Sequence, residues 1–269
     1  MAVTQFQARI LKMLASNRIK EGETYVAGGL ALNHQLHRPR VSHDIDVFSD
    51  TDEALYCSAR ADRETLKSAG LAVAVKRELP FMIEVTVSDG NETTDIQWAK
   101  DSAYRFFPLV EDDVLGVTLH PFDLATNKLL ALACRNVPRD WIDMVSCSEV
   151  LQPLGLLAWA ANGKDNGLTP RFILEMAAMV HYSQSELDLA ILSSEDIDVV
   201  ALSEKWRGML DDARGMITLL PPDKIGTAVL NGDGTLFNGT NDALAAALRE
   251  DAIVFHPGRI CGAWPQIVR

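Results

Sequence analysis

The sequence predicts an α/β fold in its first part, built on a small sheet with flanking helices, followed by a mainly helical second part. Up to about residue 115, short strand-like apolar runs alternate with segments of helical periodicity, and after Pro121 the helical periodicity dominates. The chain has 269 residues, of which 48% are hydrophobic, so it can bury a substantial core. We expect an α/β domain over residues 1–118 and a mainly helical domain over residues 119–269.

The elements of the first part follow from local patterns. Residues 6–20 have the spacing of an amphipathic helix, and residues 24–27 form a short apolar strand that ends at Gly28 and Gly29. The apolar residues that follow these glycines recur at helical spacing, so a helix is expected to begin there. A further helix is expected over 53–69, a strand over 71–75, and a hairpin of strands 81–87 and 93–98 around an Asp-Gly-Asn turn.

The most informative residues are two aspartates on the strand that follows the glycines. Successive strand side chains point to opposite faces, so Asp44 and Asp46 share one face, while Ile45 points into the core. Paired carboxylates suit a hard divalent cation such as Mg²⁺, which usually completes its coordination with water and substrate phosphates. Glycines at a helix start allow backbone N–H groups to approach a phosphate. The pattern therefore predicts a Mg²⁺–nucleoside triphosphate site.

These residues also carry a family resemblance. Gly28 and Gly29, followed after fourteen residues by Asp44-Ile45-Asp46, resemble the signature of the DNA polymerase beta type nucleotidyltransferase superfamily, and the whole stretch resembles the first motif of the AbiEii/AbiGii toxin family. Arg40 and Ser42 occupy further positions of that motif. The resemblance implies a nucleotidyltransferase-type mixed sheet, one or two Mg²⁺ ions held by Asp44 and Asp46, and an NTP whose phosphates are oriented by the two glycines, Arg40 and Ser42.

A second stretch, residues 120–145, resembles another motif of the same family. Lys128, Arg135, Arg139, Asp140 and Asp143 occupy its places. Lys128 and Arg135 lie two turns apart on one face of a predicted helix, so both are candidates to contact a triphosphate, with Lys128 contributed to the cleft by the helical domain. The alternatives are a solvated surface residue for Lys128 and, for Arg139, Asp140 and Asp143, a local salt bridge that fixes the helix corner.

Pro138 sets a boundary in this stretch. Proline removes a backbone donor and disfavours the helical conformation of the preceding residue, so the first helix is expected to stop near Asn136 and a second to begin near Arg139. Further helices are expected over 151–161, 170–180, 185–192 and 201–217.

A third carboxylate usually accompanies such an acidic pair. Asp95 lies between Thr94 and Ile96 on the return strand of the predicted hairpin, where it would complete the metal site or accept a proton. Glu84, interleaved with apolar residues on the first hairpin strand, is the alternative.

Charge and composition restrict the partners. The net charge is −12 and there is no basic tail, so an RNA must be held by local clusters of arginine and lysine. Four scattered cysteines indicate neither a zinc site nor a disulfide framework. No run approaches ~18 apolar residues, and the N-terminal segment does not have the pattern of a secretory signal, so we expect a cytoplasmic protein with no membrane partner.

Four functions are compatible with these features. The resemblance implies a toxin of a bacterial toxin–antitoxin pair that transfers a nucleotide from NTP to an acceptor, either a tRNA 3′ end or a protein hydroxyl, under the control of a cognate antitoxin. The alternatives are a nucleotidyltransferase acting on a small molecule such as an aminoglycoside, a non-catalytic nucleotide-binding module, and a structural protein in which the motif is a coincidence.

Overall fold

The computed structural model describes residues 3–21, 23–42, 44–190 and 197–266. The chain divides into two compact units: unit 1 comprises residues 1–103 and 108–120, and unit 2 comprises residues 104–107 and 121–269. The division into functional domains at residue 118 stays a prediction.

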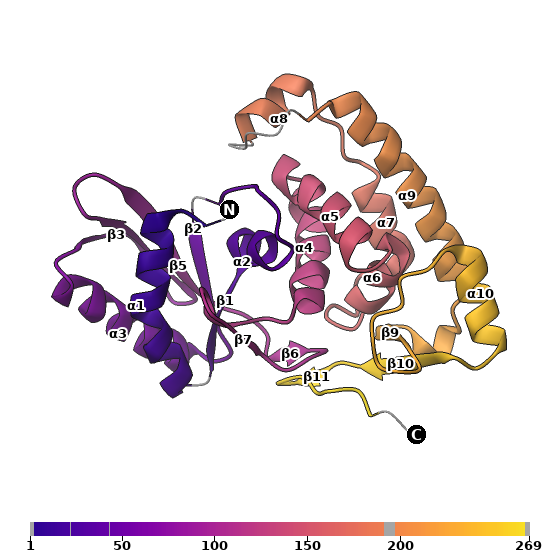
Figure 1. Ribbon diagram of the computed structural model, residues 1–269, viewed down its shortest axis with the longest axis horizontal. Coiled ribbons are helices and arrows are strands. Elements are labelled where there is room, and N and C mark those ends of the chain that lie inside the picture. Colours follow the sequence, from indigo (N-terminus) through magenta and orange to yellow (C-terminus); the bar gives the residue numbers. More distant parts are fainter. Residues whose placement is uncertain (1–2, 22, 43, 191–196, 267–269) are drawn as a thin grey trace. The chain divides into compact units, whose positions relative to one another are not determined.

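Unit 1 contains three helices and a mixed sheet of seven strands among the described residues, in the order β3-β4-β5-β2-β1-β8-β7 (Figure 1). Strands β2 and β5 run parallel, as do β1 and β8, and the other neighbours are antiparallel. The predicted mixed α/β sheet with flanking helices is therefore confirmed. The elements are α1 (Gln5–Glu21), β1 (Thr24–Ala27), α2 (Gly28–Gln35), β2 (Asp44–Ser49), α3 (Asp52–Ser68), β3 (Ala72–Leu79), β4 (Met82–Ser88), β5 (Thr93–Lys100), β7 (Val110–Asp112) and β8 (Gly116–Thr118).

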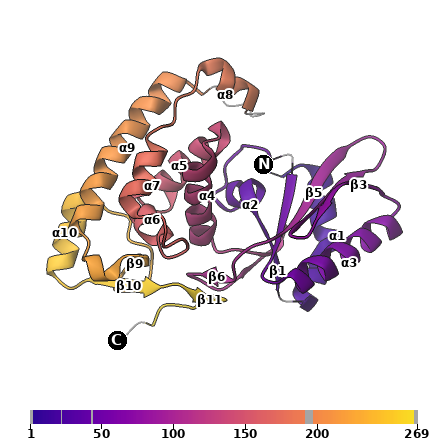
Figure 2. The same cartoon turned by 180° about the vertical axis from the view of Figure 1, so that it is seen from behind.

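Helices α1 and α3 lie side by side on one face of this sheet, as Figures 1 and 2 show. A buried ion pair joins them: Arg18 Nη2 lies 3.1 Å from Asp62 Oδ2, and both side chains are fully buried. The indole N–H of Trp98 on β5 donates to the same carboxylate oxygen at 2.9 Å. The alternating apolar side chains of the central strands point to this covered face, so the polar side chains between them point to the other face.

Unit 2 is mainly helical, as predicted. It holds α4 (Pro121–Arg135), α5 (Pro138–Val150), α6 (Leu154–Ala161), α7 (Pro170–Ala177), α8 (Gln184–Ala190), α9 (Val199–Leu219), the 3₁₀ turn η1 (Pro222–Lys224), α10 (Asn241–Arg249) and the short strands β6 (Tyr104–Arg105), β9 (Thr227–Asn231), β10 (Ile253–Pro257) and β11 (Arg259–Ile260). The predicted break between α4 and α5 at Pro138 is confirmed. The last residues of the helix predicted over 185–192 lie outside the described residues.

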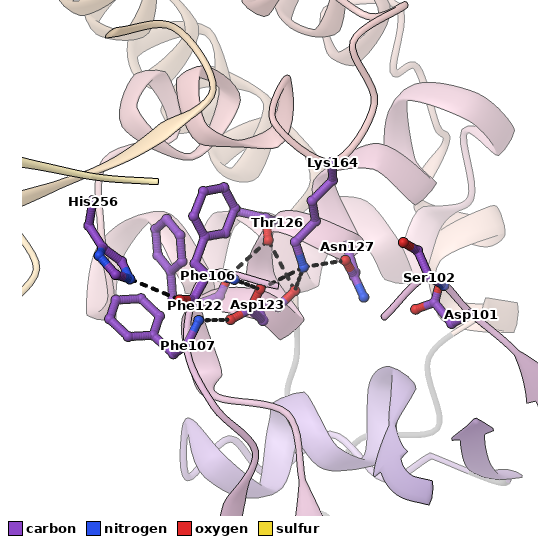
Figure 3. Close-up of polar contacts among 10 residues, drawn as sticks. All are labelled: Asp101, Ser102, Phe106, Phe107, Phe122, Asp123, Thr126, Asn127, Lys164 and His256. Carbon is purple, nitrogen blue, oxygen red and sulfur yellow. Dashed lines mark hydrogen bonds and ion pairs between the residues drawn. The ribbon is translucent and has the colours of Figure 1, made fainter. Parts of the chain in front are cut away.

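The segment Tyr104–Phe107 is held in unit 2 by a buried carboxylate. The backbone N–H groups of Phe106 and Phe107 donate to Asp123 at 2.9 and 3.0 Å, and Lys164 Nζ lies 2.8 Å from the same side chain (Figure 3). The Nε2 of His256, on β10, lies 2.9 Å from the carbonyl oxygen of Phe106. These bonds fix the start of α4, because Asp123 lies in its first turn.

None of the helices in the described ranges combines the length and apolar composition needed to cross a membrane alone. Helices α5 and α6 meet the two requirements of length and composition only when they are taken together, and the chain bends by 110° between them.

Candidate active site

The centre of the candidate site is the polar face of β2 in unit 1. Along this strand Asp44, Asp46 and Phe48 are half-buried, whereas Ile45 and Val47 are fully buried. The two aspartates therefore share the face of the sheet opposite α1 and α3, as their spacing predicts.

Asp46 lies directly against the backbone of Gly28. The two neighbouring strands pair Asp46 with Ala27, the residue before Gly28. A Cβ added to Gly28 would lie 1.9 Å from Asp46 Oδ2 and 2.7 Å from its Cγ, and Gly28 has φ +69°. Glycine is thus required twice, by the left-handed backbone and by the close approach of the carboxylate. The turn and the aspartate form one structural unit.

Helix α2 begins at this point. Its first N–H groups have no acceptor within the helix, and the residue before it, Ala27, supplies no side-chain cap. Gly29 lies in the same first turn, and its carbonyl oxygen accepts a bond from Asn33 Nδ2 at 2.7 Å. The uncapped start of α2 offers backbone N–H donors for a phosphate. The two carboxylates beside it suit a cation, which would partly neutralise the charge of that phosphate.

Asp95 lies in the same row of the sheet as Asp44. The register pairs Asp95 with Asp44 on β2 and with Thr86 on β4. Its carboxylate accepts bonds from Thr86 Oγ1 at 2.6 Å and from Lys76 Nζ at 2.7 Å. Burial raises the pKa of Asp95, but the bonds from Lys76 and Thr86 outweigh it and lower the pKa below its ordinary value. The lowered pKa keeps Asp95 ionised at neutral pH.

Lys76 on β3 was not among the predicted site residues. Its ammonium group bridges both candidates for the third acid, at 2.7 Å from Asp95 and 2.9 Å from Glu84 Oε1. The hydrogen bond to Asp95, and after it in size the one to Glu84, raises the pKa of Lys76 well above its ordinary value. The sequence places Lys76 beside Arg77, but two neighbouring charges in the chain do not reveal a partner on another strand.

Arg40 and Ser42 lie in the loop between α2 and β2. Both are buried, with 6% and 7% of their surface exposed. The carbonyl oxygen of Ser42 accepts a bond from Gln7 Nε2 at 2.8 Å, which ties the loop to α1. Their predicted contact with phosphate stays a prediction.

Lys128 and Arg135 lie in unit 2, in a charge cluster with α5. Lys128 Nζ is 2.8 Å from Asp140 Oδ1 and 3.2 Å from Asp143 Oδ2, and Arg135 Nε is 2.6 Å from Asp140 Oδ2. Lys128 is 8% exposed and Asp140 is fully buried. The alternative of a solvated Lys128 is therefore wrong. Asp140 and Asp143 do form ion pairs, but the basic groups in these pairs belong to Lys128 and Arg135 on α4.

The pKa of Asp140 reflects this cluster. Burial raises the pKa, but the bond from Arg135 and the charge of Lys128 lower it below the ordinary value of an aspartate. The carboxylate is thus held ionised inside unit 2. A phosphate contact by Lys128 or Arg135 stays a prediction.

The oxygen ligands of the candidate site can be compared with those that Mg²⁺ requires. Within the described ranges, no group of three or more His, Cys, Asp or Glu side chains is arranged to hold a metal ion. Asp44 and Asp46 nevertheless fit the ion, because Mg²⁺ is commonly bound through one or two carboxylates together with water and substrate phosphates. The assignment of Asp95 as a third ligand stays a prediction, since its carboxylate is bonded to Lys76 and Thr86.

Comparison with known proteins identifies the fold. No protein-family model and no curated protein match the sequence. The crystal structure of JHP933 from Helicobacter pylori matches at 14% identity and a TM-score of 0.51, over 80% of this chain and 95% of that protein. A candidate nucleotidyltransferase from H. pylori matches at 16% identity and a TM-score of 0.52, over 80% of this chain and 96% of that protein.

A weaker match is MenT4, a nucleotidyltransferase toxin from Mycobacterium tuberculosis, with 12% identity over 91% of each chain; its TM-score of 0.48 is too low to support an inference. At such low identities, structural similarity establishes a shared fold and not a shared activity. The chain therefore has the fold of the two H. pylori proteins, in agreement with the predicted nucleotidyltransferase-type architecture.

Proposed function

We propose that this protein is a Mg²⁺-dependent nucleotidyltransferase, the toxin of a bacterial toxin–antitoxin system, which transfers a nucleotide from NTP to an acceptor hydroxyl and releases pyrophosphate. The observation that carries the proposal is the close contact between the Asp46 carboxylate and the backbone of Gly28. Asp44 lies on the same strand face as Asp46, and the uncapped helix α2 begins at Gly28. The fold shared with a candidate nucleotidyltransferase supports it.

The residues of unit 1 have distinct roles in this reaction. Asp44 and Asp46 hold the ion, and Gly28 and Gly29 present backbone N–H groups to the phosphates. When bound, Mg²⁺ supplies positive charge that neutralises the triphosphate and the departing pyrophosphate. The acceptor hydroxyl oxygen forms a bond to the α-phosphorus and releases its proton to solvent water, while the bond from that phosphorus to the bridging oxygen of the β-phosphate breaks and pyrophosphate leaves. Positioning and charge neutralisation supply most of the rate enhancement.

Further residues are assigned from the family motifs and, for Asp95, from its place on the strand beside Asp44. Arg40, Ser42, Lys128 and Arg135 orient the phosphates, and Asp95 supports the second metal position. In this proposal the acceptor is a tRNA 3′ end or a protein hydroxyl, a cognate antitoxin restrains the enzyme, and the protein acts in the cytoplasm. An aminoglycoside acceptor is the second candidate, because a net charge of −12 attracts a cationic drug.

A transfer assay tests the proposal. The protein is incubated with each of four α-³²P-labelled NTPs and Mg²⁺, together with total tRNA, a cell protein extract or aminoglycosides. We expect label on one acceptor class, and loss of transfer in Asp44→Asn and Asp46→Asn variants that keep the wild-type circular dichroism spectrum. The matched control is Asp113→Asn, an exposed acid elsewhere in unit 1, which should retain full activity.

Absence of transfer under all conditions, with NTP binding intact, would instead favour a non-catalytic nucleotide-binding module. Unfolding of the Asp44 and Asp46 variants would mean that these side chains support the core and not a ligand.

A further inference from the structure

Unit 2 contains a cavity of about 500 Å³ between the N-terminal ends of α6 and α10 and the middle of α9. Its apolar lining includes Leu154, Met209 and Met216. This volume lies in the range of small-molecule sites, which are typically apolar with a few polar groups that fix orientation.

The charge of the cavity is negative. Asp212 on α9 and Asp242 on α10 line it, both are exposed, and neither has a basic partner in the part of the chain that the structure describes. None of the described lining residues is a lysine, arginine or histidine. The electrostatic potential in the cavity therefore favours a cation.

Two buried oxygen atoms of the lining are unsatisfied. Ser148 is 9% exposed, and its Oγ has no hydrogen-bond partner among the described residues. Asn241 donates from Nδ2 to the carbonyl oxygen of Asp212 at 3.2 Å, and its Oδ1 accepts no bond from any residue in the described ranges. A buried polar atom without a partner costs free energy, so a ligand that supplies donors is favoured.

The helix start at α10 does not reverse this preference. Thr240 caps the helix by accepting a bond from the N–H of Ala243 at 3.3 Å, and Asp242 places a negative charge in the first turn. The partial positive charge of the helix end is thus already compensated within the chain. The helix end therefore does not offset the negative charge of the lining.

We propose that this cavity binds an organic cation, an ammonium or guanidinium group on an aliphatic stem. The stem contacts Met209 and Met216, and the charged group donates to Asp212, Asp242 and Asn241 Oδ1. A free polyamine and a lysine or arginine side chain of another protein share this chemistry. The proposal is independent of the nucleotidyl transfer assigned to unit 1.

The test is a titration of the full-length protein, labelled with ¹³C at the methionine methyl groups, with spermidine and, separately, with Nα-acetyl-lysine methylamide. We expect the methyl signals of Met209 and Met216 to shift, and those of Met144 on α5 and Met176 on α7, which do not line the cavity, to stay constant. Stronger binding of spermidine would identify a polyamine site, and stronger binding of the lysine derivative would identify a protein side-chain site.

Variants separate this site from general attraction to an acidic protein. Asp212→Asn and Asp242→Asn should each weaken spermidine binding by about tenfold, the scale of one charged hydrogen bond. Glu204→Gln, which removes an exposed acid from the same helix α9 outside the cavity, should change the affinity less than twofold. Ser148→Ala removes the other unsatisfied acceptor of the lining and should weaken binding. It should not lower stability, because the hydroxyl has no hydrogen-bond partner in the part of the chain that the structure describes.

Equal affinity in the Asp212→Asn and Glu204→Gln variants would overturn the proposal, as would shifts of all methionine signals together. If one variant unfolds, the other carboxylate variant and the methionine signals of the wild type still decide the outcome.

Discussion

Gly28→Ala tests the link between the glycine turn and Asp46. The added Cβ would lie 1.9 Å from Asp46 Oδ2, whereas real Cβ contacts do not fall below 3.0 Å, so the carboxylate must move by about 1.1 Å. Its Cγ and Cβ, at 2.7 and 2.9 Å, are also too close, so the whole side chain must shift. A misplacement of about 1 Å in a reacting constellation costs about 10²-fold in rate.

The matched control is Gly70→Ala. Gly70 also has a positive φ, +82°, but no atom of the described residues lies within 4 Å of its added Cβ. Both variants should lose about 1–2 kcal/mol of unfolding free energy to the left-handed backbone, measured by urea denaturation. Only Gly28→Ala should lose about 10²-fold in nucleotidyl transfer. Equal activity of the two variants would refute the assignment of Asp46 to the site.

Three other predictions concern the charged clusters. Lys128→Met removes one cation from the fully buried Asp140 and should lower the unfolding free energy by about 3 kcal/mol in urea; a loss below about 1 kcal/mol would contradict a structural role. Because the folded-state pKa of Asp140 is lowered, the stability it contributes is present above about pH 4 and is lost as the pH falls through the folded-state pKa. The unfolding free energy measured in urea should therefore fall less between pH 7 and pH 2.5 in Asp140→Asn than in the wild-type protein. Identical pH profiles of the two proteins would exclude this contribution of Asp140. Lys76→Met should raise the pKa of Asp95, followed by carboxyl ¹³C NMR, and an unchanged titration would show that the contact does not persist in solution.

Local patterns predicted the main elements of the site. The alternation on β2 placed Asp44 and Asp46 on one face because a strand repeats every two residues. The break between α4 and α5 followed from the missing backbone donor of Pro138. Such features depend on near neighbours in the chain, so the sequence carries them directly.

Contacts between distant segments were not predictable in the same way. The bridge from Lys76 to Asp95 depends on strand register, and the charge cluster of Lys128 depends on how α4 packs on α5. Strands β9 and β10 were missed because each is five residues long and their pairing joins segments that flank a helix. Periodicity within a short run cannot identify such a partner.

The most direct test of the central claim is a crystal structure with Mn²⁺, as a substitute for Mg²⁺, and a non-hydrolysable NTP. We predict an anomalous scattering peak bound by the carboxylates of Asp44 and Asp46, with the phosphates on the N–H groups of Gly28 and Gly29. A metal–triphosphate complex bound elsewhere on the protein, with these two carboxylates free, would contradict the account.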